Sequence, residues 1–244
     1  MRKEFVKTEN HKRFMTALEL KAGHAAAESN LVVVRGRAGD GKTCTMHNFA
    51  ASNRAVMLTA NPSWTVRRMM VELASALSIP TQGAWEKAVE TAIAEDEIPM
   101  IVDEAGFALA SNAACVERLR SITDKSGTLL VLVVMERDMA RLQQHDQITS
   151  RATLCAFGAS TVADVKAACS QLAEVEIDDD LVERIHRDTT GRMRLVIEAI
   201  NLVEAMTQAK GKQRATLADL KGLALCDDFN ASVSRARTSR GGRA

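Results

Sequence analysis

The sequence predicts an α/β protein: a parallel sheet with helices on both faces, followed by a small all-helical lid domain. Four apolar stretches alternate with helical patterns, which is typical of a parallel sheet covered on both sides. A glycine-rich loop joins the first of these strands to a helix. Strand patterns end near residue 158, and helical periodicity follows. We therefore expect an N-terminal helical extension (1–29), an α/β domain that carries the glycine-rich loop (30–158), the lid (159–230) and a basic disordered tail (231–244).

In the α/β part, each element follows from its local pattern. Phe14, Leu18 and Ala22 recur every four residues, which predicts a helix ending near Gly23. Short apolar runs that end at glycine, proline or asparagine predict the strands, and apolar residues three or four apart predict the helices. In chain order, the expected strands cover 31–34, 55–59, 100–103, 128–134 and 153–157. Helices are expected over 42–52, after Asn61-Pro62, after Gly83, before Gly127 and over 138–142.

The last third of the chain reads as helix throughout. The expected helices cover 162–172, 181–186, 193–206 and 217–225, with N-caps at Ser160 or Thr161, Asp178 and Thr216. The last stretch of the chain, 232–244, has four arginines, no acid and little apolar content, which predicts a disordered basic tail. These arginines are Arg235, Arg237, Arg240 and Arg243.

Composition excludes several classes of protein. Hydrophobic residues make up 46% of the 244 residues and charged residues 26%, so neither a disordered chain nor a collagen-like fibre fits. Thirty-two basic and 31 acidic residues give a net charge of +1, so a polyanionic partner must be bound by local patches. Six Phe, two Trp and no Tyr leave little for stacking on single-stranded bases.

The cysteines and the apolar runs indicate a cytoplasmic protein. Five cysteines are widely spaced, with no pairing suited to a metal, so we expect reduced thiols. The first residues lack the apolar stretch of a signal peptide. The longest apolar run, 129–135, is far shorter than the ~20 residues that span a bilayer.

The strongest motif is G-x-x-x-x-G-K-[ST], which the sequence fits at Gly36-Arg37-Ala38-Gly39-Asp40-Gly41-Lys42-Thr43. The glycines allow successive backbone N–H groups to face phosphates, and Cys44 continues into the helix. We expect Lys42 to bind the β- and γ-phosphates of ATP, and the Thr43 hydroxyl to bind Mg²⁺. An ordinary glycine turn is the alternative, but no turn requires Lys and then Thr.

An acidic pair, Asp103 and Glu104, ends the strand expected over 100–103. Carboxylates at the carboxyl end of a parallel strand face the crevice in which such sheets bind ligands. We expect Asp103 to hold hydrated Mg²⁺ and Glu104 to orient or deprotonate the attacking water. Without the glycine-rich loop, a helix-capping pair would be the better interpretation.

These features together resemble the AAA+ ATPases over roughly residues 30–225. The resemblance implies an arginine finger at Arg151, which would reach the nucleotide of a neighbouring subunit, and a sensor-2 arginine at Arg194 in the lid. Either residue could instead be a surface arginine, and Arg192 is the neighbour most easily confused with Arg194.

One part of the AAA+ pattern is missing. The resemblance implies an Asn or Thr after the strand at 128–134, whereas the chain has Met135, Glu136 and Arg137. Either Glu136 or Arg137 takes the place of this polar residue, or the position has no polar residue at all. The departure bears on the rate of ATP hydrolysis more than on ATP binding. Asn61 could restrain Glu104 as a similar asparagine does in many relatives, or it could simply form a turn.

Within this superfamily, the chain looks most like the phage Mu B, TnsC and IstB-like activators of target DNA in transposition. That resemblance implies assembly on duplex DNA without strong sequence preference, as a helical filament or a ring, in a bacterial or phage-infected cell. The partner would be a transposase. Candidate DNA contacts are Arg67, Arg68 and the tail residues Arg235, Arg237 and Arg240, although a charged helix start is more often a solvated face.

Three alternatives remain open from the sequence. The first is a replication-initiation or helicase-loading AAA+ ATPase. The second is a small-molecule P-loop kinase, which the pairing of Glu104 with Asp103 and the whole helical domain disfavour. The third is a DNA-binding structural protein with a vestigial ATP site, suggested by the missing Asn or Thr after the strand at 128–134.

Overall fold

The computed structural model describes residues 1–22 and 30–226, which form two compact units. The α/β unit comprises Asn10–Ala38 and Lys42–Gly158. The helical unit comprises Met1–Glu9, Gly39–Gly41 and the described residues from Ala159 onward. The predicted basic tail, 231–244, lies outside the described residues.

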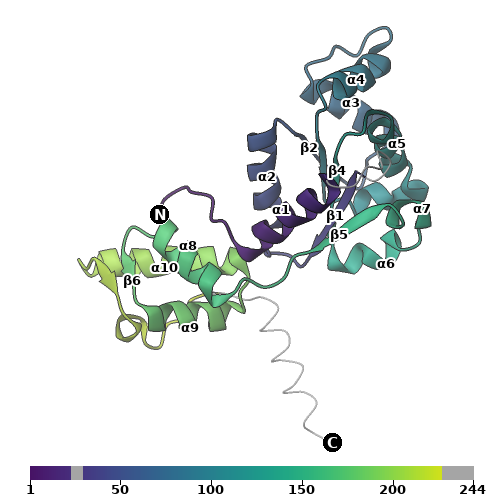
Figure 1. Ribbon diagram of the computed structural model, residues 1–244. Helices are drawn as coiled ribbons and strands as arrows, with labels where there is room; N and C mark the ends of the chain where they lie inside the picture. Colours follow the sequence, from purple (N-terminus) through teal and green to yellow (C-terminus); the bar gives the residue numbers. More distant parts are fainter. Residues whose placement is uncertain (23–29, 227–244) are drawn as a thin grey trace, which may run out of the picture. The chain divides into compact units, whose positions relative to one another are not determined.

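The α/β unit is built on one five-stranded parallel sheet with the strand order β2-β3-β4-β1-β5 (Figure 1). The strands are β1 (Leu31–Gly36), β2 (Val56–Thr59), β3 (Met100–Asp103), β4 (Leu130–Met135) and β5 (Ala152–Ala156). β1 lies between β4 and β5, and β4 lies between β3 and β1. The carboxyl ends of β1, β3 and β4 are therefore neighbours, although β1 and β3 are far apart in the sequence. The predicted parallel sheet is confirmed.

Side chains of β1 alternate between two apolar cores, one on each face of the sheet. Val32 and Val34 pack with Phe14 and Phe49, whereas Val33 packs with side chains of the other face. The first core receives α1 (Glu9–Ala22) and α2 (Lys42–Asn53). The other receives α3 (Val66–Ala76), α4 (Trp85–Glu95), α5 (Ala110–Ser126), α6 (Met139–Leu142) and α7 (Asp146–Thr149). The sheet is thus covered on both faces, as predicted.

The helical unit contains α8 (Val162–Leu172), α9 (Asp179–Thr189) and α10 (Met193–Ala209). Thr161 caps α8 through a capping box with Asp164. Two features depart from the all-helix expectation. A two-stranded parallel ladder pairs β6 (Glu176–Ile177) with β7 (Arg214–Ala215). The helix predicted over 217–225 is wrong beyond its first turn, because only a 3-10 turn, η4 (Leu217–Leu220), forms before Gly222 adopts φ +80°.

The first nine residues belong to the helical unit, whose helices begin more than 150 residues downstream in the sequence. The Arg2 N–H donates to the Leu172 carbonyl at 2.8 Å, and the Glu9 N–H donates to Asp164 Oδ1 at 2.8 Å. Met1 and Val6 pack against the apolar core of this unit. These residues therefore complete a core that the downstream helices build.

Candidate functional site

The glycine-rich loop adopts the backbone that its glycines allow. It begins where β1 ends, at Gly36, and it closes where α2 begins, at Lys42. Gly39 has φ +91° and Gly41 has φ +83°, which side-chain-bearing residues rarely adopt. A Cβ at Gly41 would meet nothing within 4 Å, so this position needs glycine for its backbone alone. The loop is a curled cradle of the kind that binds phosphates.

Lys42 is held within this loop by backbone oxygens. Its side chain is buried, and Nζ donates to the Gly36 carbonyl at 3.0 Å and to the Arg37 carbonyl at 2.7 Å. A third neighbour, Met135 Sδ, lies 3.6 Å from Nζ. Phosphate oxygens are stronger acceptors than carbonyls for an ammonium group, so an incoming phosphate can take over these hydrogen bonds.

Thr43 and Asp103 meet across the site, although they are far apart in the sequence. Thr43 Oγ1 donates to Asp103 Oδ2 at 2.8 Å, and the Glu104 N–H donates to Asp103 Oδ1 at 2.8 Å. Asp103 is buried at the end of β3. A hydroxyl and a carboxylate are hard oxygen donors of the kind that Mg²⁺ prefers, so this pair fits the metal that an ATP-binding site requires.

Glu104 follows immediately in a strained backbone conformation. Its φ is +51°, in the left-handed region that a residue with a long side chain seldom adopts. Within the described part of the chain, no hydrogen bond or ion pair engages its half-buried side chain. The strain is of the kind that is often found at functional sites. Glu104 therefore places an uncommitted carboxylate next to the predicted metal ligand.

The two charged residues that follow β4 make contacts away from the glycine-rich loop. Glu136 Oε1 accepts from Arg35 Nη1 at 2.8 Å, so its carboxylate is paired on β1. Arg137 is 74% exposed and lies 3.8 Å from Asp138. The residue of β4 that contacts the glycine-rich loop is Met135, which lies opposite Gly36 in the strand register. Sequence reasoning missed Met135, because only the β1–β4 pairing reveals it.

Arg194 meets the glycine-rich loop through its backbone. Its N–H donates to the Gly39 carbonyl at 3.2 Å, and both residues belong to the helical unit. Arg194 is exposed in the first turn of α10, whereas Arg192 is the half-buried N-cap residue of that helix. A Cβ added to Gly39 would lie 3.5 Å from the Cβ of Arg194 and 3.7 Å from that of Arg192.

Arg151 lies at the opposite end of the sheet from the glycine-rich loop. It immediately precedes Ala152, which pairs with Leu31 at the start of β1, whereas Gly36 ends that strand. At ~3.3 Å per residue, the two ends of β1 are about 16 Å apart. Arg151 Nη1 lies 3.5 Å from Asp124 Oδ2 on α5. The structure therefore does not bring Arg151 to the phosphate cradle of its own chain.

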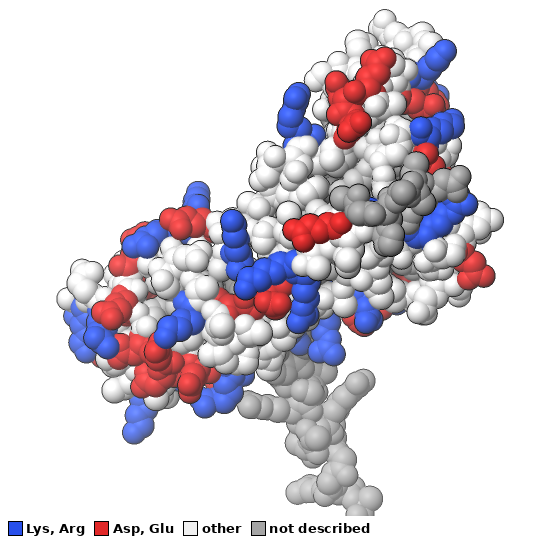
Figure 2. Space-filling view, viewed as in Figure 1, with Lys and Arg blue, Asp and Glu red and all other residues white. Residues whose placement is uncertain are grey.

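The candidate DNA contacts at the start of α3 differ from each other. Arg67 is exposed, whereas Arg68 donates to Glu72 Oε1 at 3.1 Å and to Ser63 Oγ at 2.8 Å. Asn61 Oδ1 accepts from the backbone N–H and the hydroxyl of Ser63, so Asn61 forms a local turn. Basic and acidic side chains are interspersed over the face of the helical unit in Figure 2. Arg235, Arg237 and Arg240 lie outside the described residues.

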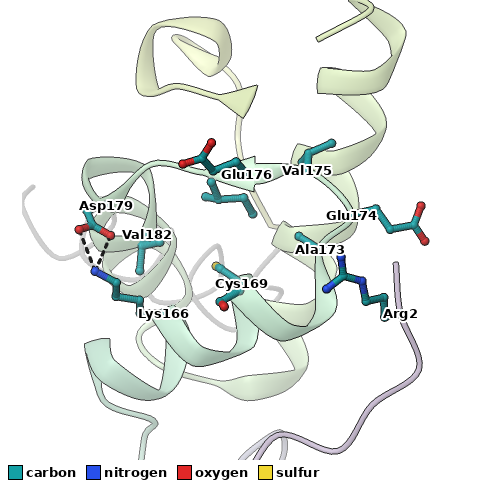
Figure 3. Close-up of a pocket in the computed structure, with 11 residues that line it drawn as sticks. Arg2, Lys166, Cys169, Ala173, Glu174, Val175, Glu176, Asp179 and Val182 are labelled. Atoms are coloured by element: carbon teal, nitrogen blue, oxygen red, sulfur yellow. Dashed lines mark hydrogen bonds and ion pairs between the residues drawn. The ribbon is translucent and has the colours of Figure 1, made fainter. Parts of the chain in front are cut away.

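A separate cavity of about 300 Å³ lies in the helical unit, between α8, β6 and the start of α9 (Figure 3). Lys166 and Asp179 form an ion pair at 2.8 Å at its edge. Burial raises the pKa of the Cys169 thiol to about 12, so this cysteine stays protonated and unreactive at neutral pH. The cavity contains none of the predicted site residues. In residues 1–22 and 30–226, no helix is long and apolar enough to cross a membrane, and all five cysteines are free thiols.

Comparison with solved structures identifies the fold. No known protein family and no curated protein matches the sequence. The structure is similar to RuvB, the Holliday junction branch migration motor of Thermotoga maritima, with a TM-score of 0.65 and 20% identity over 98% of this chain and 79% of that chain. It is also similar to the Aeropyrum pernix ORC1 protein in a complex with DNA, with a TM-score of 0.58 and 16% identity over 93% and 67%. For domain III of the Thermotoga maritima replication initiation protein DnaA, the TM-score is 0.54 and the identity is 14%, over 88% of this chain and 91% of that chain. The chain has the fold of the AAA+ P-loop NTPases.

Proposed function

We propose that this chain is an ATP-dependent, DNA-binding AAA+ ATPase. The observation that carries the proposal is the meeting of Thr43 and Asp103 beside a glycine-rich loop that holds the ammonium of Lys42. Bound Mg²⁺·ATP would supply the γ-phosphoryl group and the charge of the cation. Backbone N–H groups of residues 36–44 bind the phosphates, and Lys42 exchanges loop carbonyls for phosphate oxygens. Residues 30–158 act as the nucleotide-binding domain and residues 159–230 as its lid.

The remaining site residues take roles around this cradle. Thr43 Oγ1 and Asp103 would hold the metal, and the carboxylate of Glu104 would orient and deprotonate the attacking water. Arg194 would contact the nucleotide from the lid, because its backbone already binds the Gly39 carbonyl. The ATP hydrolysis that results is slow until DNA or a partner stimulates it, since β4 contains only apolar residues and ends in Met135.

Arg151 acts on the nucleotide of a neighbouring copy. The strand register separates it from its own phosphate cradle, so any nucleotide that it contacts would belong to another protomer. An interface in which one copy donates an arginine to the next is heterologous and produces either a closed ring or a helical filament. ATP therefore drives assembly in this proposal.

The finer proposal is that the assembly coats duplex DNA and activates it as the target of a phage-type transposase. The motifs that resemble the Mu B, TnsC and IstB-like group support it. Exposed Arg67 and the tail arginines Arg235, Arg237 and Arg240 would contact phosphates without reading sequence. Arg68, which is already paired with Glu72, is the weaker candidate.

A second candidate is replication initiation or helicase loading. It is favoured by the similarity of the fold to DnaA, a replication initiation protein, and to ORC1 in a complex with DNA. Both candidates share the ATP site and the duplex, and they differ in the protein partner. Stimulation of strand transfer by a phage-type transposase would favour the first, whereas loading of a replicative helicase would favour the second.

The test of the coarser proposal measures ATP hydrolysis with and without duplex DNA. We expect DNA to stimulate turnover by the unaltered chain, and Lys42→Ala to abolish nucleotide binding. Glu104→Gln should bind ATP and remain on DNA, while turnover falls by a factor of about 10² or more. Nucleotide binding that Lys42→Ala leaves intact would refute the phosphate-cradle assignment. Phosphorylation of a small acceptor in place of hydrolysis would identify a kinase.

A further inference from the structure

The carboxyl end of β4 contributes a thioether to the phosphate cradle. Met135 pairs with Gly36 in the register of β1 and β4, and its sulfur lies 3.6 Å from Lys42 Nζ. The neighbouring carboxylate, that of Glu136, is instead paired with Arg35. β4 thus places the half-buried thioether of Met135, and not the carboxylate of Glu136, against Lys42.

The contacts of Lys42 Nζ differ in strength. Carbonyl oxygens at 2.7 and 3.0 Å are good acceptors for an ammonium group, whereas thioether sulfur is a weak one. An amide or carboxylate at the same place would form a charge-assisted hydrogen bond of ordinary strength. Because Lys42 must turn from the loop to the phosphates, each strong acceptor in the empty site competes with the ligand.

We propose that Met135 is a positioning residue for Lys42, an inference that rests on the ATP-binding function proposed above. Its thioether fills the space beside the ammonium without offering Lys42 a strong acceptor. The contact is weak enough for phosphate oxygens to displace it. Because Met135 does not compete with phosphate for the ammonium, the affinity for nucleotide is higher than it would be with an amide or a carboxylate at this position.

Two substitutions of similar size test this. Met135→Gln keeps an unbranched side chain of similar reach and adds an amide oxygen that accepts strongly from Lys42. We expect its dissociation constant for Mg²⁺·ATP, measured by calorimetry, to rise about tenfold, as a hydrogen bond to a charged group predicts. KM should rise in parallel and kcat should change little, because in the bound state Lys42 has left residue 135. Met135→Leu, which has no strong acceptor, should stay within about threefold of the unaltered affinity.

The control for the chemistry of the substitution is Met15→Gln on the exposed side of α1. It makes the same exchange away from the cradle, and we expect no change in ATP affinity. If Met135→Gln binds ATP as tightly as the unaltered chain, or if Met135→Leu weakens binding as much as Met135→Gln does, the proposal is overturned.

A second readout needs no nucleotide. In the chain that retains Lys42, Met135→Gln should raise the unfolding temperature of the nucleotide-free protein, because it adds a hydrogen bond to the ammonium. In the Lys42→Met variant the same substitution should not raise the unfolding temperature, because the ammonium is gone. An equal shift in both backgrounds would mean that the new amide acts without the lysine and would overturn the proposal. If the unaltered chain binds no ATP but this cycle shows coupling, the proposed function fails while the contact between positions 135 and 42 stands.

Discussion

Asp103 uses both carboxylate oxygens although it is almost fully buried. Oδ1 accepts from the Glu104 N–H and Oδ2 from the Thr43 hydroxyl. A buried carboxylate is tolerated only when donors of this kind surround it. A bound Mg²⁺ would be held by the Thr43 hydroxyl oxygen and by Asp103, and it would give Oδ2 a stronger partner than the hydroxyl proton.

Asp103→Asn should therefore separate metal binding from nucleotide binding. The amide retains one acceptor but loses the negative charge, so Mg²⁺ should no longer strengthen ATP binding. Calorimetry with ATP in EDTA should give an affinity within about threefold of that of the unaltered chain. A variant whose ATP affinity still increases on addition of Mg²⁺ would show that Asp103 is not a metal ligand.

The residues of the phosphate cradle could be predicted because their chemistry is local. The loop from Gly36 to Thr43 is continuous in sequence, and Asp103 follows a strand that the apolar pattern reveals. The Met135–Lys42 contact could not be predicted, because it depends on β4 lying beside β1. The location of Arg151 at the far end of β1 depends on strand register, which a single sequence does not specify.

At the scale of single elements, the strongest patterns gave the best predictions. The helix expected over 162–172 is α8 itself, and Thr161 is its N-cap. The ladder of β6 and β7 could not be predicted, because strands of two residues are too short to show an alternation of apolar and polar side chains. Residues 217–225 are apolar enough for a helix, yet Asp219 turns back to Thr216 in a capping box and the 3-10 turn ends before Gly222.

The adjacent residues Ser160 and Thr161 make a matched test of the α8 cap. Thr161→Ala removes the hydroxyl that accepts from the Asp164 N–H, so we expect the unfolding free energy to fall by about 1 kcal/mol. Ser160 Oγ is buried with no hydrogen-bond partner among the described residues, so Ser160→Ala should cost nothing or stabilise slightly. Urea denaturation measures both. Equal losses for the two variants would contradict this account of the cap.

At the scale of the whole molecule, assembly depends on whether Arg151 serves a neighbouring copy. Arg151→Ala should lose ATP hydrolysis and ATP-driven assembly together. Mixing it with Lys42→Ala should partly restore turnover, since one variant then supplies the arginine and the other an intact cradle. Hydrolysis is measured across a titration of the two proteins. A mixture no more active than its components would leave Arg151 as a surface residue paired with Asp124.

The basic tail offers a test at the same scale. Ending the chain after Asn230 removes Arg235, Arg237, Arg240 and Arg243. If all four contact phosphates, the slope of log affinity against log salt should become shallower by about 3.6, at ~0.9 per contact. Fluorescence anisotropy with labelled duplex at several salt concentrations measures it. An unchanged slope would exclude the tail from the DNA interface.

The joining of Met1–Glu9 to helices that begin at Val162 has a consequence for how the protein is made. A ribosome adds about 5–20 residues per second, so the first nine residues emerge several seconds or more before the partners that they need. During that interval Val6 and its neighbours have no core to enter. The helical unit can be completed only after synthesis has passed α10, so its two ends must find each other after the whole sheet has been translated.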